Sequence, residues 1–537
     1  MEKAEKRENK FAKGALILLL GGIVCKLIGG FYRVPLSNII GAEGIGVYQL
    51  IFPVYSLLLV FASGGVPVAL SKLVASCRAN GEIKRAKRFL WQGVIILLLI
   101  SLLFAVLFLA LAKQISNFQG NSNAALGYVG ASIAIIFAST LTAFRGYFQG
   151  YQNMTPTAIS QIIEQVLKLV LGLTFASFLI SKGTSFGVLG AMLGVASGEV
   201  VALLYLGIRY IFKRKKVDVL EPVCKTSYKQ DFRTLLKMSL PITLNALILP
   251  LILAVDSFLI VNLLTSNGVS SGGATEMFGV YSGMVNSLVN LPTVVSSALA
   301  VSLIPSITFE SEKNNGKNEV GGIFKIVFFV AVPCIFVFFA FSREIIGVLY
   351  PSATSPELLN LGGSLLKITA INILYISLLQ VTTSVLQAKN KSGVALWNLA
   401  IAGVLKVLFT IVFVSSKLGI YGAAVSSVLC YAIASGLNVI SLGGVLEFNL
   451  KPKTFLFILL NSLLTLGISF GLNYLFNLFL SEFLSLIFSL FIAVFFYFIL
   501  TIIFPIFSDE EFSKIPYGNR IVFLKNKLFN KFKRKRI

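Results

Sequence analysis

The chain is dominated by long apolar runs that recur along most of its length. A window of about 19 residues finds fourteen of them, near residues 12–40, 44–74, 90–112, 127–149, 157–180, 187–212, 238–264, 276–304, 323–341, 361–388, 392–414, 419–445, 454–478 and 484–507. A helix needs roughly 20 apolar residues to cross a bilayer. Hydrocarbon also forces the backbone to satisfy its own hydrogen bonds. The runs therefore predict an all-α polytopic membrane protein of about 14 transmembrane helices, and they exclude a soluble domain.

The basic residues predict the orientation of the chain. An even number of helices places both termini on one side, and that side carries 34 of the Lys and Arg residues. The opposite side carries only Lys113, Lys182, Arg343 and Lys417. The positive-inside rule then puts both termini in the cytoplasm. The net charge of +24 thus reflects topology and not a nucleic-acid partner, and we expect the basic tail 531–536 to meet anionic membrane lipids.

Short motifs repeat at offsets between 232 and 238 residues. The matching pairs are Gly46-Val47-Tyr48 with Gly279-Val280-Tyr281, Asn80-Gly81 with Asn315-Gly316, Gln149 with Gln387, Val166-Leu167-Lys168 with Val404-Leu405-Lys406, and Gly187, Gly190 and Ala191 with Gly419, Gly422 and Ala423. They predict two six-helix units in tandem and, since six is even, parallel ones. The expected divisions are an N-lobe (1–212), a basic cytoplasmic linker (213–237), a C-lobe (238–446), helices 13 and 14 (447–507) and a basic cytoplasmic tail (508–537).

The composition argues against catalysis. The chain has no His, which removes imidazole acid/base chemistry and most transition-metal sites. Its five cysteines are dispersed and form no CxxC pair. We therefore expect no catalytic residue, no metal and no cofactor, and a protein that is not an enzyme.

Charged residues at membrane depth are the candidates for function, because ionised side chains there are costly and face an interior or a wet cavity. At 1.5 Å per residue, Lys26 lies about 20 Å and Arg33 about 30 Å along the first helix. The set has four cations and three anions, and its net charge of about +1 predicts an anion-accepting cavity. The cations, expected to bind substrate, are Lys26, Arg33, Lys168 and Lys406; the anions, candidates for ion coupling, are Glu164, Glu199 and Asp256.

Structural alternatives stay open for several of these residues. Glu164 and Lys168 are spaced i, i+4 and could neutralise each other as a pair. Asp256 could bind a cation or a proton. Lys406 has Ala402 at i−4, which favours a substrate or interhelical role for it. Four cations close to helix ends are expected only to reach for the membrane surface: Lys72, Arg145, Arg209 and Lys367.

Helix-breaking residues mark candidate gates. Pro removes a helical hydrogen bond, and the freed carbonyl must find a partner in protein or water. We expect bending at Pro53, Gly64, Gly65, Pro67, Pro241, Pro250 and Pro292.

Three segments carry a family resemblance. KLIGGFYRVPLSNIIGAEGIGVYQ (26–49), GGVPVALSKLVA (64–75) and RGYFQGYQNMTPTAISQIIEQ (145–165) resemble the stage V sporulation protein B and lipid II flippase-like branch of the multidrug/oligosaccharidyl-lipid/polysaccharide exporter superfamily. The resemblance implies a bacterial cytoplasmic-membrane flippase that moves an undecaprenyl-pyrophosphate-linked saccharide by alternating access. It also implies that Lys26 and Arg33 bind the pyrophosphate, and that helices 13 and 14 form a groove for the lipid tail.

Two other function classes are weighed against the flippase. A drug or metabolite antiporter of the same superfamily would grip organic cations with its acidic residues, which the cationic first helix argues against. A membrane-embedded transferase would need a metal-binding carboxylate cluster or a His. No Walker A pattern is present, so we expect energy from the membrane potential or from a proton or sodium gradient. The expected partners are the lipid-linked glycan and anionic lipids, and a monomer suffices.

Overall fold

The computed structural model describes residues 2–214, 227–310, 316–351, 355–443, 452–504 and 506–507, and within these ranges the chain forms helices and no β-strand. The elements are α1 (Glu2–Ser63), α2 (Val66–Ala79), α3 (Ile83–Phe118), η1 (Ser122–Ala124), α4 (Ala125–Gly150), α5 (Thr155–Leu179), η2 (Ile180–Lys182), α6 (Thr184–Arg214), α7 (Tyr228–Ala246), α8 (Ile248–Ser266), α9 (Ser271–Phe278), the π-helical η3 (Gly279–Val285), α10 (Asn286–Glu310), α11 (Gly316–Ala340), α12 (Ser342–Leu349), α13 (Pro356–Thr369), α14 (Asn372–Ala388), α15 (Ser392–Val414), α16 (Ile420–Leu442), α17 (Pro452–Asn477) and α18 (Glu482–Ile503). Most of the predicted linker (215–226) and the predicted tail (508–537) lie outside the described residues.

The prediction of an all-α polytopic membrane protein is confirmed. Eleven helices of the described ranges are long and apolar enough to cross a membrane, or thirteen if each of two bent helix pairs counts as one span. The first of them, Leu20–Ala79, is a run of 60 residues that covers two predicted helices. The count of fourteen therefore stays a prediction.

Helix α1 is broken at Gly41, whose φ of 75° is a conformation that favours glycine. Gly14 lies against Met154, just before α5, and Gly44 lies against Thr184, just after it. The first half of α1 thus runs the length of α5. After the break the chain turns back, and α1 ends against α7.

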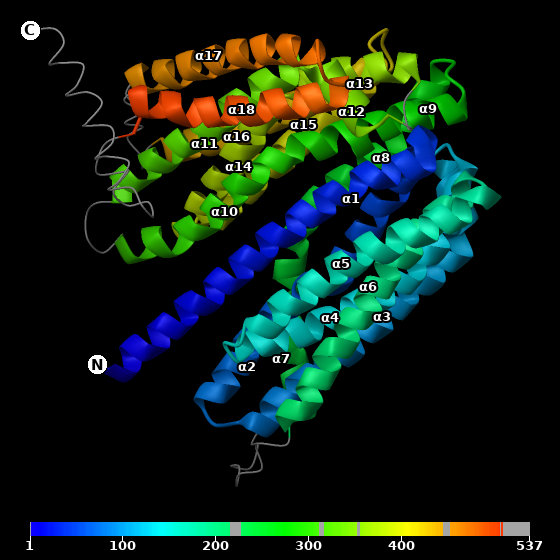
Figure 1. Cartoon of the computed structure of the whole chain (residues 1–537). Helices are drawn as coiled ribbons and strands as arrows, with labels where there is room; N and C mark the ends of the chain where they lie inside the picture. The colour runs from blue at the N-terminus through cyan, green and yellow to red at the C-terminus, as the bar shows by residue number, and fades with distance from the viewer. Residues whose placement is uncertain are drawn as a thin grey trace, which may run out of the picture.

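The helices form two groups, with α1 between them (Figure 1). Helices α2 to α7 lie on one side and α8 to α18 on the other. Helix α7 packs on α2 and α3, whereas α8 packs on α1 and α15. The helix predicted over 238–264 is therefore two helices. They separate at Leu247, because Pro250 has no N–H to donate to the carbonyl of Ala246.

Helix α1 meets the second helix group through a reciprocal glycine contact. A Cβ added to Gly46 would overlap the carbonyl of Thr275, and one added to Gly279 would overlap the carbonyl of Ala42. Both Gly46 to Gly279 and Ala42 to Thr275 are 233 residues apart. Such an exchange of partners is what a two-fold relation between tandem repeats requires.

Further contacts between the groups lie at this same end of the molecule. Asn121 Nδ2 donates to Thr275 Oγ1 at 2.8 Å, and Asn262 Nδ2 donates to the carbonyl of Phe118 at 2.7 Å. Figure 1 shows the groups meeting near α8 and α9 and diverging toward the N-terminal end of α1. The structure is thus closed at the end away from the N-terminus.

The predicted bending residues lie at breaks and inside helices. Gly64 and Gly65 separate α1 from α2, and the backbone N–H of Gly65 donates to Thr243 Oγ1 of α7 at 3.0 Å. The prolines lie inside α1 (Pro53), in the first turns of α2 and α8 (Pro67 and Pro250), inside α7 (Pro241) and inside α10 (Pro292). Their gating role stays a prediction.

Candidate functional site

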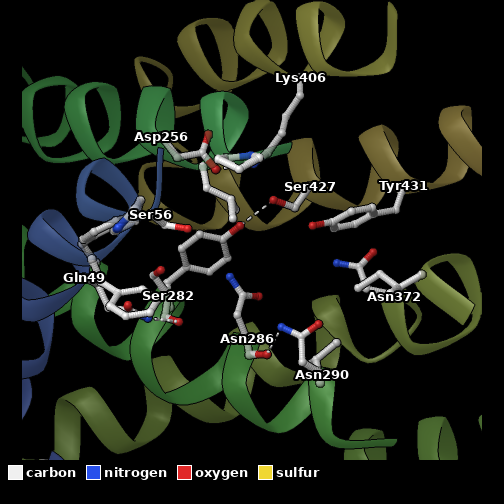
Figure 2. A pocket seen from close by; sticks show the side chains of 18 of the residues that line it. Gln49, Ser56, Asp256, Ser282, Asn286, Asn290, Asn372, Lys406, Ser427 and Tyr431 are labelled. Atoms are coloured by element: carbon white, nitrogen blue, oxygen red, sulfur yellow. Dashed lines mark hydrogen bonds and ion pairs between the residues drawn. The ribbon is translucent and has the colours of Figure 1, made fainter. Parts of the chain in front are cut away.

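A cavity of about 160 Å³ lies where α1 meets α8, η3, α10, α14, α15 and α16. One wall carries the pair Asp256 and Lys406, and the opposite wall carries the amides of Asn286, Asn290 and Asn372 (Figure 2). Arg33, Gln49 and Ser56 of α1, together with Tyr281, Ser282, Ser427 and Tyr431, complete its polar lining. The cavity is thus a polar space enclosed by apolar helices.

Arg33 is the cation of this cavity that carries no counter-charge. Its guanidinium donates to Ser287 Oγ of α10 at 2.8 Å. Within the described ranges no carboxylate forms an ion pair with it. A hydroxyl partner satisfies a donor but leaves the positive charge in place, so Arg33 supplies a net positive field to the cavity.

Lys26 is a second cation on α1, on the N-terminal side of Arg33. Its Nζ donates to Ser297 Oγ of α10 at 2.9 Å, and its side chain is exposed. It lies seven residues, or about 10 Å, before Arg33 on the helix. Lys26 does not line the cavity itself. The two cations instead follow α10 from an exposed position to the cavity.

Asp256 of α8 and Lys406 of α15 form a buried ion pair. Lys406 Nζ donates to Asp256 Oδ2, and the two residues are 3% and 7% exposed. Lys406 thus makes an interhelical contact while also lining the cavity, and its substrate role stays a prediction. The pair is electrically neutral as a unit, so Lys406 adds little net charge to the cavity. The second oxygen of Asp256, Oδ1, is buried without a hydrogen-bond partner.

Glu164, the acidic residue of α5, forms an ion pair with Arg145 of α4. Arg145 donates to Glu164 Oε2 at 2.7 Å and to Ser160 Oγ at 3.0 Å. The expectation that Arg145 reaches for the membrane surface is wrong, since its side chain is only 14% exposed. Its planar guanidinium can engage two acceptors at once, and this interhelical pair takes the place of the i, i+4 pair of Glu164 with Lys168.

Lys168 instead lies over two aromatic rings. Its Nζ is 5.2 Å from the ring centre of Tyr32 and 5.0 Å from that of Phe52. Phe52 also lines the cavity, so the lysine lies just behind the cavity wall. Cation–π attraction holds such an ammonium without cancelling its charge. Glu199 is buried in the same region and interacts electrostatically with Glu164 and Lys168.

The amides of the cavity were missed by the sequence analysis. Asn286 and Asn290 stand one turn apart on α10, and Asn290 Nδ2 donates to the carbonyl of Asn286 at 2.7 Å. The i, i+4 spacing of the two amides in an apolar helix could have predicted a polar face on this helix, because it places both side chains on one side. Asn372 had no such local signal, since its place beside them depends on how α14 packs.

The described residues contain no group of three or more Cys, Asp or Glu side chains arranged to hold a metal ion. What the site offers is a cation on α1, a second cation behind aromatic rings, and several neutral donors and acceptors. This combination suits a ligand with an anionic group joined to a polar, uncharged part.

Comparison with known proteins gives consistent matches. Residues 11–309 match the family described as "Polysaccharide biosynthesis protein". Among curated relatives, "Stage V sporulation protein B" of Bacillus subtilis (strain 168) is 28% identical, covering 83% of this chain and 86% of the relative. "Lipid II flippase MurJ" of the same organism is 26% identical, covering 75% of this chain and 77% of the relative.

Solved structures share the fold. A lipid II flippase MurJ in an inward closed conformation matches with a TM-score of 0.70 at 17% identity, covering 91% of this chain and 98% of that one. An inward-facing MATE family transporter of the MOP superfamily matches with a TM-score of 0.61 at 15% identity, covering 78% and 93%. These matches confirm the resemblance inferred from the three sequence segments.

Proposed function

Because the chain belongs to the polysaccharide biosynthesis protein family, we propose that it is a membrane flippase. Its substrate in this proposal is an undecaprenyl-pyrophosphate-linked saccharide, a precursor of cell wall or spore cortex, which it moves from the inner to the outer leaflet of the cytoplasmic membrane by alternating access. The names of the two Bacillus relatives, a sporulation protein and a lipid II flippase, support this substrate class.

The observation that carries the proposal is the uncompensated charge of Arg33 at the cavity between α1 and the second helix group. A pyrophosphate diester carries about two negative charges, and a guanidinium can engage its oxygens bidentately. In the proposal, Lys26 meets the pyrophosphate first, at the exposed position, and Arg33 holds it in the cavity. Lys168 adds to the positive field from behind Phe52.

The neutral lining of the cavity supports a glycan attached to that pyrophosphate. Asn286, Asn290 and Asn372 offer both donors and acceptors, which match hydroxyl and acetamido groups. An inorganic anion alone would leave these amides without a ligand.

Energy can come from the membrane potential. With both termini in the cytoplasm, as the basic residues predict, outward movement of an anion follows an inside-negative potential and gains about 2.3 kcal/mol per charge at 100 mV. Of the three acidic candidates for ion coupling, Glu164 and Asp256 are held in ion pairs. Glu199, which forms no ion pair within the described residues, is the one we propose as a proton-binding group.

A cation-coupled antiporter is the second candidate function, favoured by the fold shared with a MATE family transporter. Such a protein would use free carboxylates to bind organic cations. Here the carboxylate at the cavity, Asp256, is already occupied by Lys406, and for this reason the flippase is preferred.

Rescue of a bacterium depleted of its lipid II flippase tests the proposal. The native chain should restore growth, and Arg33→Ala should not, because loss of a charged hydrogen-bond donor removes about 1.5–3 kcal/mol of binding, roughly tenfold to a hundredfold in affinity. Arg33→Lys should be intermediate. The matched control is Arg209→Ala, which removes an exposed arginine of α6, with membrane levels of all variants compared through a terminal tag.

The variants test the binding site, and the native chain tests the identity of the substrate. Growth with Arg33→Ala equal to the native chain would remove Arg33 from the binding site. Failure of the native chain despite normal membrane levels would overturn the lipid II assignment, and would move another lipid-linked glycan or the antiporter to the front.

A further inference from the structure

A second hollow lies away from the central cavity, between α7 and the helices α1, α2 and α3. It is a groove of about 850 Å³. Its walls are mainly apolar, with Phe61 and Val66 on one side, Ile96 and Ile100 on another, and Leu240 and Leu244 on α7. Two cations of α7, Arg233 and Lys237, also line it.

The groove borders the lipid-facing perimeter of the protein. Helix α3, which forms one wall, exposes a long apolar face in which Leu99, Leu103 and Val106 are each more than half exposed. The groove residues Phe61 and Leu240 are 52% and 61% exposed. Apolar side chains on the perimeter of a membrane-spanning helix contact acyl chains.

The cations lie at the polar end of the groove. Asp231, two residues before Arg233 on α7, is fully buried and forms ion pairs with Arg85 at 2.9 Å and Arg88 at 3.1 Å. This cluster marks the level of the lipid headgroups, since charges avoid hydrocarbon. Arg233 and Lys237 are exposed and spaced i, i+4, so they share one face of α7. Within the described residues neither forms an ion pair.

We propose that this groove binds an anionic phospholipid, with its phosphate on Arg233 and Lys237 and an acyl chain along Phe61, Leu240 and Leu244. The positive charges of Arg233 and Lys237 select an anionic headgroup. The apolar walls select a lipid over free phosphate. Near a membrane surface each such cation contributes about a fivefold enrichment of anionic lipid.

Occupancy of the groove has a structural consequence. Helix α7 continues directly into α8 of the other helix group. It is docked on the junction between α1 and α2 by the hydrogen bond that the N–H of Gly65 donates to Thr243 Oγ1. A lipid held between α7 and α3 fills the space beside that junction. Bound lipid therefore braces α7 against α1 and α3.

Quenching of a tryptophan reporter by brominated lipid tests the proposal. The chain has two tryptophans, and Trp91→Phe with Trp397→Phe provides a dark background into which Phe61→Trp is placed. The protein is reconstituted in phosphatidylcholine with phosphatidylglycerol, and at equal mole fractions either one or the other is brominated. The ratio of the two quenching constants measures the local preference for the anionic lipid.

The expected ratio at the groove is at least about fivefold in favour of phosphatidylglycerol. It should fall to near one in the double variant Arg233→Gln with Lys237→Gln. The matched control, Lys72→Gln with Lys391→Gln, removes two exposed cations that do not line the groove and should leave the ratio unchanged. A second reporter, Phe491→Trp on the exposed face of α18, should give a ratio near one.

Three results would overturn the proposal. The first is a ratio near one at Phe61→Trp in an otherwise native groove, and the second is a ratio unaffected by loss of Arg233 and Lys237. The third is loss of the preference when a small amount of undecaprenyl phosphate is added, since this would assign the groove to the isoprenoid chain instead of a phospholipid.

Discussion

Helices α5 and α15 occupy corresponding places in the two sequence repeats, and they agree in backbone packing but differ in charge. A Cβ added to Gly190 would lie 2.5 Å from the carbonyl oxygen of Phe175, and one added to Gly422 would lie 2.6 Å from that of Phe413. Both pairs follow the repeat offsets. The crossing of α5 with α6 is therefore repeated as the crossing of α15 with α16.

The lysines on these helices have different partners. Lys406 is paired with Asp256 of α8, whereas Lys168 lies over two aromatic rings. At the offset that relates Gly46 to Gly279, the residue corresponding to Asp256 is Ile23. The first sequence repeat therefore has no acidic residue at the position that corresponds to Asp256, the partner of Lys406.

The backbone packing at these crossings is thus shared between the repeats, whereas the charged partners differ. Small residues at helix crossings fix how closely the backbones approach, which tolerates little change. Charged side chains need only one partner within reach, which a single substitution can add or remove. The cavity consequently has a neutral wall at Asp256 and Lys406 and a cationic side at Arg33, with Lys168 behind it.

The largest expected effect comes from breaking the neutral pair. Asp256→Asn leaves the Lys406 ammonium buried without a counter-charge, and we expect a loss of about 3–5 kcal/mol of stability, read as the thermal unfolding temperature in nanodiscs. The double variant Asp256→Asn with Lys406→Met removes both charges and should recover most of the loss. Equal stability of the single and double variants would show that the pair carries no such penalty.

The next effect tests the shared scaffold. Gly190→Val and Gly422→Val should destabilise the protein to a similar degree, by about 1–3 kcal/mol each, because both press a side chain onto a neighbouring backbone. Gly207→Val on α6 and Gly436→Val on α16 are the controls, since no atom lies within 4 Å of an added Cβ at either. A tolerated change at one crossing and a damaging one at the other would contradict the repeated geometry.

The smallest effect concerns Lys168, which forms no ion pair within the described residues. Lys168→Met should cost only about 1 kcal/mol of stability through loss of the cation–π contacts, less than Lys406→Met, which strands Asp256. If Lys168 adds to the field of the cavity, rescue of growth should weaken with Lys168→Met and persist with Lys168→Arg. A stability loss as large as that of Lys406→Met would mean that the two lysines have equivalent structural roles.

Local patterns in the sequence were sufficient for the fold class and for part of the site. Apolar runs predicted the spans. Repeated short motifs predicted the tandem units, which stay a prediction. Arg33 could be selected because an ionised residue in an apolar run is costly wherever it lies. The break of the helix predicted over 238–264 was signalled by Pro250, but which helix group each half would join was not.

Where the chain is apolar, where it is cationic and where it repeats can be read from the sequence, because these are properties of neighbouring residues and of constant offsets. Which charged side chains form pairs follows only from the folded structure. Lys406 pairs with Asp256, which is 150 residues away in the sequence. Glu164 pairs with Arg145 and not with Lys168, although Lys168 is closer in sequence. Ion pairing depends on distances between helices, and helix packing sets those distances.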